Sequence, residues 1–304
     1  MKTITVTNGA GYSLAFAQRY SGGFVLTNAT GILEAKADVI RTDNAMSDGS
    51  IWNSSRLKER AIVLTIRDDP SANHRQLRMR LYRLFQIKAP LTLSYTDGTA
   101  TREIDVYTES VTCDVSKRAN TYTVSLIAPD PFFRDAAATE REVAAWEGAF
   151  EFPADASAPD TGLFEFDADA LDTDVLEFGT RTEDLIVSCE NAGDVPCGMV
   201  ITFLASGSVT NPGLLNVDSG ERLSLNLAMQ AGDAVTVDTR FGRRTAVLTR
   251  DGAAENVFRC VDAGSTFLQL AVGENNFTAM LDGAAAASAD LDISVWYEQQ
   301  YVGA

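Results

Sequence analysis

The sequence predicts a mainly β protein of two domains, with a single α-helix in the first. Its 304 residues exceed one small module and suit two domains of about 100–200 residues each. Apolar and polar residues alternate with period two along most of the chain, which is typical of strands with one buried face. Charge divides the chain as well, because residues 1–135 hold 17 basic and 14 acidic side chains whereas residues 136–304 hold 8 basic and 28 acidic ones.

Three runs of alternating residues predict strands in the first domain, which we place at residues 1–135. Each run puts its apolar residues on one side, where they would face a core. The pair Asp97-Gly98 between two such runs predicts a tight hairpin turn, since aspartate and glycine tolerate the required backbone angles. The apolar residues of the three runs are Ile62, Leu64 and Ile66, then Leu91, Leu93 and Tyr95, then Tyr122, Val124 and Leu126.

One segment departs from this alternation and predicts a helix at about residues 72–87. Leu77, Leu81, Leu84 and Phe85 have the spacing of residues that share one helix face. The polar residues just before it, Asp68, Asp69 and Ser71, suit an N-terminal cap and the helix dipole. The outward side is expected to carry four arginines that either face solvent or dock on an acidic neighbour; these candidate interface residues are Arg75, Arg78, Arg80 and Arg83.

The second domain is predicted at residues 151–304, after a linker at 136–150. Prolines at 129 and 131 end a strand, and an alanine- and glutamate-rich stretch follows them. Beyond it, strands are expected within residues 162–179, 183–205, 221–239 and 291–303. Many short strands with glycine-bearing turns predict a sandwich of two antiparallel sheets. The clearest alternations are Leu223, Leu225, Leu227 and Met229, and Leu291, Ile293, Val295 and Tyr297.

The residues that carry chemistry do not form a catalytic pattern. His74 is the single histidine, and a capping or surface role is expected for it because no G-x-S-x-G or similar nucleophile motif accompanies it. No glycine-lysine pair exists, which excludes a P-loop. We therefore predict neither an enzyme nor a cofactor.

Metal binding and disulfide bonding are not predicted either. The acidic run Asp167, Asp169, Asp172, Asp174 and Glu177 lacks the ligand spacing and the glycine of an EF-hand loop. Cys189 and Cys197 are the closest pair of the four cysteines. They either bridge a hairpin or are buried thiols, and the second is favoured in a chain without an export signal.

Charge and hydropathy also restrict the partners. A net charge of −20 over residues 136–304 repels phosphates, so sequence-specific nucleic-acid binding is not expected. No run approaches the ~20 apolar residues that cross a bilayer, and the first residues do not form a secretory signal. We expect a protein made in a cytoplasm and not bound to a membrane.

Several strings, taken in their order along the chain, resemble the distal tail protein of bacteriophages with long, non-contractile tails. In the first half these are residues 48–69, the arginine-rich helix, residues 91–111 and the close of the domain at IAPDPFFRD, with Asp130, Pro131, Phe132 and Phe133. In the second half they are NAGDVPCGMVITF, FLQLAVGENNFTAML and DISVWYEQQYVG. The likeness runs nearly end to end.

The resemblance implies a structural protein of the virion tail tip, assembled in the cytoplasm of the bacterial host. Its first domain would resemble tail-tube proteins and form a homohexameric ring, alone or as two rings back to back, between the tail tube and the tip or baseplate. Its second domain would be a galectin-like sandwich that projects outward. The implied partners are the tail tube protein, the tape-measure protein, the tail-tip hub protein and a receptor-binding protein.

The sugar chemistry of galectins is not carried over by this sequence. Galectins hold sugar through histidine, arginine and tryptophan, whereas residues 150–304 contain no histidine and only Trp296 as tryptophan. Two alternatives stay open. One is a carbohydrate-binding or hydrolytic tail accessory protein, in which Trp296 and Tyr301 stack on a glycan, and the other is a tube or baseplate ring protein that shares the first domain.

Overall fold

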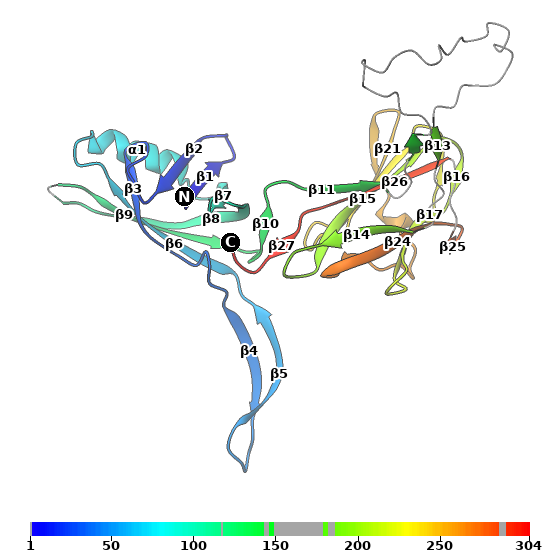
Figure 1. Ribbon diagram of the computed structural model, residues 1–304, viewed down its shortest axis with the longest axis horizontal. Coiled ribbons are helices and arrows are strands. Elements are labelled where there is room, and N and C mark those ends of the chain that lie inside the picture. Colours follow the sequence, from blue (N-terminus) through cyan, green and yellow to red (C-terminus); the bar gives the residue numbers. More distant parts are fainter. Residues whose placement is uncertain (1, 117, 143–145, 149–178, 182–185, 286–289) are drawn as a thin grey trace, which may run out of the picture. The chain divides into compact units, whose positions relative to one another are not determined.

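The computed structural model describes residues 2–116, 118–142, 146–148, 179–181, 186–285 and 290–304. Within them the protein is mainly β with one α-helix, as predicted (Figure 1). It divides into two compact units. The first contains the chain up to Thr139 together with Asn191–Cys197 and Glu298–Ala304, and the second contains Glu140–Glu190 and Gly198–Tyr297. None of the helices among these residues is long and apolar enough to span a membrane.

A nine-stranded antiparallel sheet forms most of the first unit, in the order β2-β1-β7-β8-β9-β6-β3, with β10 on β8 and β27 on β10. Its two ends, β2 and β3, lie close to each other, so the sheet curves around its core. The elements of this unit are β1 (Thr3–Asn8), β2 (Ser13–Ala17), β3 (Phe24–Thr30), β4 (Ala37–Asp43), β5 (Ser50–Leu57), β6 (Arg60–Asp68), α1 (His74–Leu84), β7 (Pro90–Thr96), β8 (Thr101–Asp114), β9 (Thr121–Ala128), β10 (Phe133–Asp135) and β27 (Gln300–Tyr301).

The predicted strand faces of the first domain are confirmed. All nine apolar residues of the three alternating runs are buried in one cluster. The register explains why, since Ile62 pairs with Leu126, Leu64 with Val124 and Ile66 with Tyr122, so that the apolar side chains of both strands point to the same side. The predicted hairpin is present between β7 and β8, where Gly98 has a φ of 109°.

Helix α1 is shorter than predicted and has a different cap. The four residues Leu77, Leu81, Leu84 and Phe85 are buried as expected. The helix begins at His74, and Asn73 caps it by accepting hydrogen bonds from the main-chain N–H groups of Arg75 and Gln76. Asp68 and Asp69 lie too far before this turn to cap it. Asp69 instead accepts hydrogen bonds from Ser71, and Asp68 is buried in the sheet.

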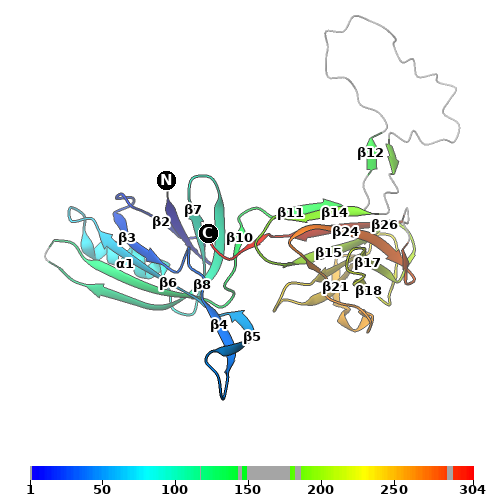
Figure 2. The same ribbon diagram turned by 60° about the horizontal axis from the view of Figure 1, so that its bottom comes forward.

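Strands β4 and β5 form a separate two-stranded sheet that pairs with no other described strand. Figures 1 and 2 show this hairpin extending away from the sheet of the first unit. Nearly all of its residues are exposed. We call residues 37–57 the arm; its exposed large apolar side chains are Val39, Ile40, Met46, Ile51 and Trp52.

The second unit contains the predicted sandwich of antiparallel sheets. One sheet has the order β11-β26-β15-β20-β21-β22 with β23 on β15, and the other has the order β14-β24-β17-β18 with β25 on β24. Smaller pairs are β12-β13 and β16-β19. The elements, from the end of the first unit onward, are β11 (Thr139–Glu142), β12 (Trp146–Gly148), β13 (Gly179–Arg181), β14 (Val187–Asn191), β15 (Cys197–Ala205), β16 (Val209–Thr210), β17 (Pro212–Asn216), β18 (Arg222–Ser224), β19 (Ala228–Met229), β20 (Ala234–Asp238), β21 (Thr245–Arg250), β22 (Ala253–Asn256), the 3₁₀-helix η2 (Phe258–Cys260), β23 (Gln269–Leu270), β24 (Gly273–Leu281), β25 (Ala284–Ala285) and β26 (Leu291–Tyr297).

The sequence predictions for this unit have different outcomes. Leu291, Ile293, Val295 and Tyr297 are all buried along β26, as the alternation indicated. The run 223–229 is not one strand, because β18 and β19 pair with different partners and Leu227 between them is only partly buried. The strand expected within 162–179 lies outside the described residues except for residue 179. The acidic run Asp167–Glu177 lies entirely outside them.

The two units do not follow one another simply along the chain. The sequence division at 135 and 151 assigned residues 191–197 and 298–304 to the second domain, whereas both segments pack with the first unit. The pairing of β10 with β27, Phe133 opposite Tyr301, accounts for the second segment. The linker at 136–150 and the two boundaries stay proposals.

Candidate assembly surfaces

The four arginines of α1 do not share one face. Arg75 and Arg78 are exposed, and the exposed Met79 and Tyr82 lie on the same side of the helix. Arg80 is partly buried, and its Nη1 donates a hydrogen bond to the carbonyl of Gly22 at 2.8 Å. Two of the predicted interface residues are thus available on one surface with apolar neighbours, a composition that is common in protein interfaces.

Arg83 is exposed but has an aromatic partner within the first unit. Its guanidinium lies 5.0 Å from the centre of the Tyr12 ring. Arg80 also approaches Tyr12, with 3.4 Å between its Nε and the phenol oxygen. The expected outward row of four arginines is therefore replaced by an exposed pair, Arg75 and Arg78, and by a second pair that packs on the loops around β2.

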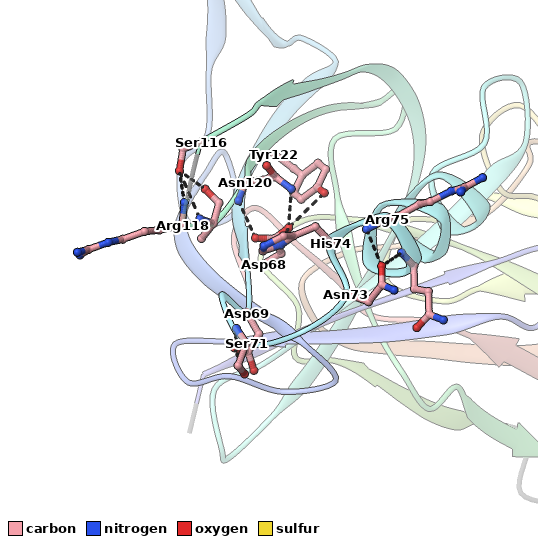
Figure 3. A network of polar contacts seen from close by, with 12 residues as sticks. Asp68, Asp69, Ser71, Asn73, His74, Arg75, Ser116, Arg118, Asn120 and Tyr122 are labelled. Atoms are coloured by element: carbon pink, nitrogen blue, oxygen red, sulfur yellow. Dashed lines mark hydrogen bonds and ion pairs between the residues drawn. The ribbon is translucent and has the colours of Figure 1, made fainter.

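Asp68 forms a buried polar network that joins three segments of the first unit (Figure 3). One carboxylate oxygen accepts a hydrogen bond from the main-chain N–H of Asn120 at 2.6 Å, and the other accepts one from the Asn120 side chain at 2.9 Å. His74 Nδ1 lies 2.9 Å from the same carboxylate, and the Tyr122 hydroxyl lies 3.5 Å from it. The network holds the start of α1 and the β8–β9 loop against the end of β6.

In the described residues, His74 has only the Asp68 carboxylate as a hydrogen-bond partner in this network. Neither a serine hydroxyl nor a cysteine thiol contacts His74 in the hydrogen bonds found for the described residues. Burial, the largest cause, raises the pKa of Tyr122 to about 12, so its hydroxyl stays protonated and donates to Asp68. The single histidine is a structural residue that bonds a buried carboxylate, where the sequence predicted a cap or a surface position.

Arg60 lies buried at the base of the arm and donates only to main-chain carbonyls. Its acceptors include Gly31 and Ile32, at 2.9 and 3.3 Å, in the segment that leads into β4. A further acceptor is Pro131, at 2.8 Å, and the guanidinium lies 5.0 Å from the centre of the Phe133 ring. The Asp-Pro-aromatic string therefore forms part of an arginine-binding pocket. The remaining acceptors of Arg60 are Glu34 and Val302.

The two aromatic residues that the sequence offered for stacking on a sugar both have an arginine over the ring. Arg240 lies 5.1 Å from the centre of the Trp296 ring and pairs with Asp238 at 2.7 Å. Tyr301 is buried in the core of the first unit, and Arg102 covers its ring at 3.6 Å. The Tyr301 ring is therefore closed to a glycan, whereas Trp296 is partly buried with an arginine over its ring.

Thiol and metal chemistry are not organised into a site among the described residues. All four cysteines are free, and burial raises the pKa of Cys189 to about 11 and that of Cys197 to about 12. Cys189 and Cys197 are buried and not bonded to each other here, and Cys113 and Cys260 are partly buried. In the described part of the chain, no three histidine, cysteine or acidic side chains gather as metal ligands would.

Comparison with known proteins relates both units to phage tails. A model of the phage tail protein RIFT-related domain matches residues 25–128, and a model of the siphovirus-type tail component C-terminal domain matches residues 192–301. Together the two ranges cover more than half of the chain. A search of curated proteins found no match.

Solved structures show the same fold over the whole chain. The Dit protein of phage SPP1, described as a paradigm of the hub adsorption apparatus in phages that infect Gram-positive bacteria, is similar with a TM-score of 0.67 and 12% identity over 98% of both chains. A chain of the phage P2 baseplate in its activated conformation with calcium is similar with a TM-score of 0.52 and 12% identity over the full length of both.

A two-unit β fold with an unpaired arm and with both units matched to tail domains defines a structural component of a bacteriophage tail. This class agrees with the order of strings along the sequence. The chain belongs to the siphovirus distal tail protein family.

Proposed function

We propose that this protein forms a hexameric ring that joins the tail tube to the tail tip or baseplate and serves as an attachment hub. The arm carries the proposal. An isolated two-stranded hairpin is marginally stable in water at best, and this one exposes Ile40, Ile51 and Trp52, the last at 65%. A second surface that covers the arm would supply the missing stabilisation.

The arm is suited to link successive copies in a ring. We propose that the hairpin of one copy meets a different surface on the next copy and that this contact is not returned by the same two copies, which makes it heterologous. Contacts of this kind generate closed rings when the rotation between copies closes. The hub role described for the SPP1 Dit protein, which has this fold, supports the attachment-hub part of the proposal.

The partners follow from this position in the tail. We propose contacts with the tail tube protein and the tape-measure protein on one side of the ring and with the tail-tip hub protein on the other, or a second ring back to back. The outer sandwich would hold a receptor-binding protein. The ring would be assembled in the bacterial cytoplasm and would act at the virion tail tip, by geometry and without catalysis.

Light scattering on the purified full-length chain tests the ring. We expect a species of about six times the chain mass of 32.7 kDa, formed alone or on addition of the tail tube protein. Ile40→Asp combined with Trp52→Asp should give a folded monomer, because charges on the arm cannot be buried without a partner. Val115→Asp is the matched control, since Val115 is also an exposed apolar residue of the first unit and should leave the ring intact.

A chain that stays monomeric at every concentration, with the tube protein present, would contradict the ring. The glycan-binding alternative makes a different prediction. It requires glycan-array binding by the full chain that disappears in Trp296→Ala, although Arg240 covers that ring.

A further inference from the structure

The β20–β21 loop of the second unit presents one aromatic side chain on a braced turn. Phe241 is 95% exposed. The main-chain N–H of Arg243 bonds to the carbonyl of Arg240 at 3.1 Å, and Gly242 has a φ of 75°, which closes a tight turn around Phe241. The turn therefore fixes the main chain from which the Phe241 ring protrudes.

Contacts at the base of the loop fix its direction. Thr239 exchanges hydrogen bonds with the main chain of Met199 at 2.8–3.0 Å, and Asp238 binds the guanidinium of Arg240 at 2.7–3.2 Å. A preorganised loop loses little conformational entropy on binding, which makes even a small contact effective.

The surroundings of Phe241 are basic and aromatic within an acidic part of the chain. Three of the eight basic residues of 136–304 lie in this one loop. Arg244 covers the ring of Phe267 at 4.9 Å, and Phe267 stacks on Phe258 at 5.7 Å. Arginine and aromatic side chains dominate the binding energy of protein interfaces. We call Arg240, Phe241, Arg243, Arg244, Phe258 and Phe267 the basic loop surface.

The other sheet of the same unit offers a complementary face. Val217 and Val272 are exposed apolar residues, and the exposed acidic residues Asp218, Glu221 and Glu274 lie next to them in the sequence, in the β17–β18 turn and at the start of β24. Asp218 accepts hydrogen bonds from the main-chain and side-chain nitrogens of Asn276, which ties the turn to β24. We call Val217, Asp218, Glu221, Val272 and Glu274 the acidic face.

We infer that the basic loop surface of one copy docks on the acidic face of a second copy of this chain. The two surfaces differ in sign, both carry exposed apolar side chains, and they are two different patches of the unit, as a heterologous contact requires. Opposite charges would offset locally the repulsion between units of strong net negative charge. The inference rests on the proposed ring and adds a contact between its sandwich units. Two patches of five or six residues form a contact smaller than most stable interfaces. Such a contact needs the high effective concentration that the ring provides.

Photocrosslinking tests the contact directly. Phe241 is replaced by p-benzoylphenylalanine in the full chain, isotopically heavy and light protein are mixed and assembled, and the irradiated ring is digested for mass spectrometry. We expect adducts that join heavy to light chains and map to residues 217–221 or 272–274. Adducts only within one copy, adducts to another surface, or a ring without any adduct would overturn the inference.

Charge reversal supplies a second test on the same photoprobe chain. Arg243→Glu with Arg244→Glu should reduce the adduct yield at least tenfold, and adding Glu221→Arg with Glu274→Arg should restore it. Arg118→Glu in the first unit is the control of equal charge change and should leave the yield unaltered. If Arg244→Glu unfolds the chain, as circular dichroism would show, the test uses Arg243→Glu alone, with Glu221→Arg to restore the yield.

The outcomes separate the inference from the proposed function. A chain that remains monomeric contradicts the ring, and the contact with it. A ring whose adduct yield does not respond to Arg243 or Glu221, or is not restored by the swap, contradicts only the contact between sandwich units.

Discussion

Arg60 has an unusual environment for a buried cation, because no carboxylate neutralises it in the contacts found for the described residues. Its guanidinium is satisfied by main-chain carbonyls from three distant segments and by the Phe133 ring. Burial lowers the pKa of Arg60, yet arginine remains charged in proteins. The five-donor fork of arginine suits this arrangement, which lysine could not reproduce.

Replacing Arg60 should therefore destabilise the first unit. Arg60→Met keeps the apolar stem but leaves several carbonyls without donors, so the free energy of unfolding should fall by at least about 2 kcal/mol, given roughly 1.5–3 kcal/mol for a hydrogen bond to a charged group. Urea unfolding followed by circular dichroism measures the change. Arg118→Met, at an exposed position, should have almost no effect, and equal stability of the two variants would contradict the role of Arg60.

The sequence could not reveal Arg60 or Asp68 as network residues. Arg60 and Asp68 are the two end residues of β6, whose alternation of apolar and polar residues is clear in the sequence. Their partners are far away along the chain, at Val302 for Arg60 and at Asn120 for Asp68. From the sequence alone, a charged residue at a strand end is interpreted as a helix cap or a surface residue. Only the tertiary pairing brings the acceptors and donors together.

At the scale of elements, α1 separates the roles of its arginines. Arg75→Glu with Arg78→Glu should weaken assembly several-fold and leave the monomer folded, because neither side chain packs inside the first unit. Arg80→Glu should instead lower the melting temperature, since it removes the bond to Gly22 and places a carboxylate near the Phe24 ring. Light scattering and thermal unfolding distinguish the two effects, and unchanged assembly of the double variant at low salt would assign Arg75 and Arg78 to solvent.

The β20–β21 hairpin predicts a pH dependence of stability. Hydrogen bonds from Arg250, the largest cause, and from the main-chain N–H of Gln230 lower the pKa of Asp233 from 3.8 to about 2. Because this pKa is lower in the folded than in the unfolded chain, the stabilisation is present above about pH 4 and is lost as the pH falls towards 2. Arg250→Gln should have a lower urea midpoint than the wild type at pH 5, and the two midpoints should converge near pH 2. A difference that stays constant with pH would contradict this assignment.

Strands and the helix were predictable where one element buries one face. The alternation at 62–66, 91–95, 122–126 and 291–297 and the helical spacing of Leu77 to Phe85 state that burial pattern directly. The prediction of a single strand over residues 223–229 was wrong. A period-two pattern does not show where one strand ends and another begins that pairs with a different partner strand. The separate hairpin of the arm was not predicted either, since its residues lack a buried face in this chain.

At the scale of the whole molecule, the first unit includes the last residues of the sequence. Tyr301 lies in its core, and Arg102 donates a hydrogen bond to the carbonyl of Gly303 at 2.6 Å. Deleting residues 298–304 should lower the free energy of unfolding of the first unit by at least about 2 kcal/mol, from the buried tyrosine and the lost acceptors of Arg60 and Arg102. Differential scanning calorimetry measures this loss. Tyr301→Phe, which keeps the ring, should cost far less, and a deletion as mild as this control would contradict the role of the segment.

The order of the strings predicted the correct family, whereas charge asymmetry did not indicate that the two units are interleaved along the chain. A boundary drawn on composition is linear, whereas Asn191–Cys197 and Glu298–Ala304 return to the first unit. Short segments of this kind have little compositional signal. The pairing of β10 with β27 that holds one of them depends on a register set by the rest of the sheet.

Residues 298–304 belong to the first unit, although the ribosome makes them after the second unit. The ribosome must finish everything up to Tyr297 before the segment that closes the first unit is made, so a polypeptide released early lacks part of that unit. The first unit is therefore complete only after the second unit has been synthesised.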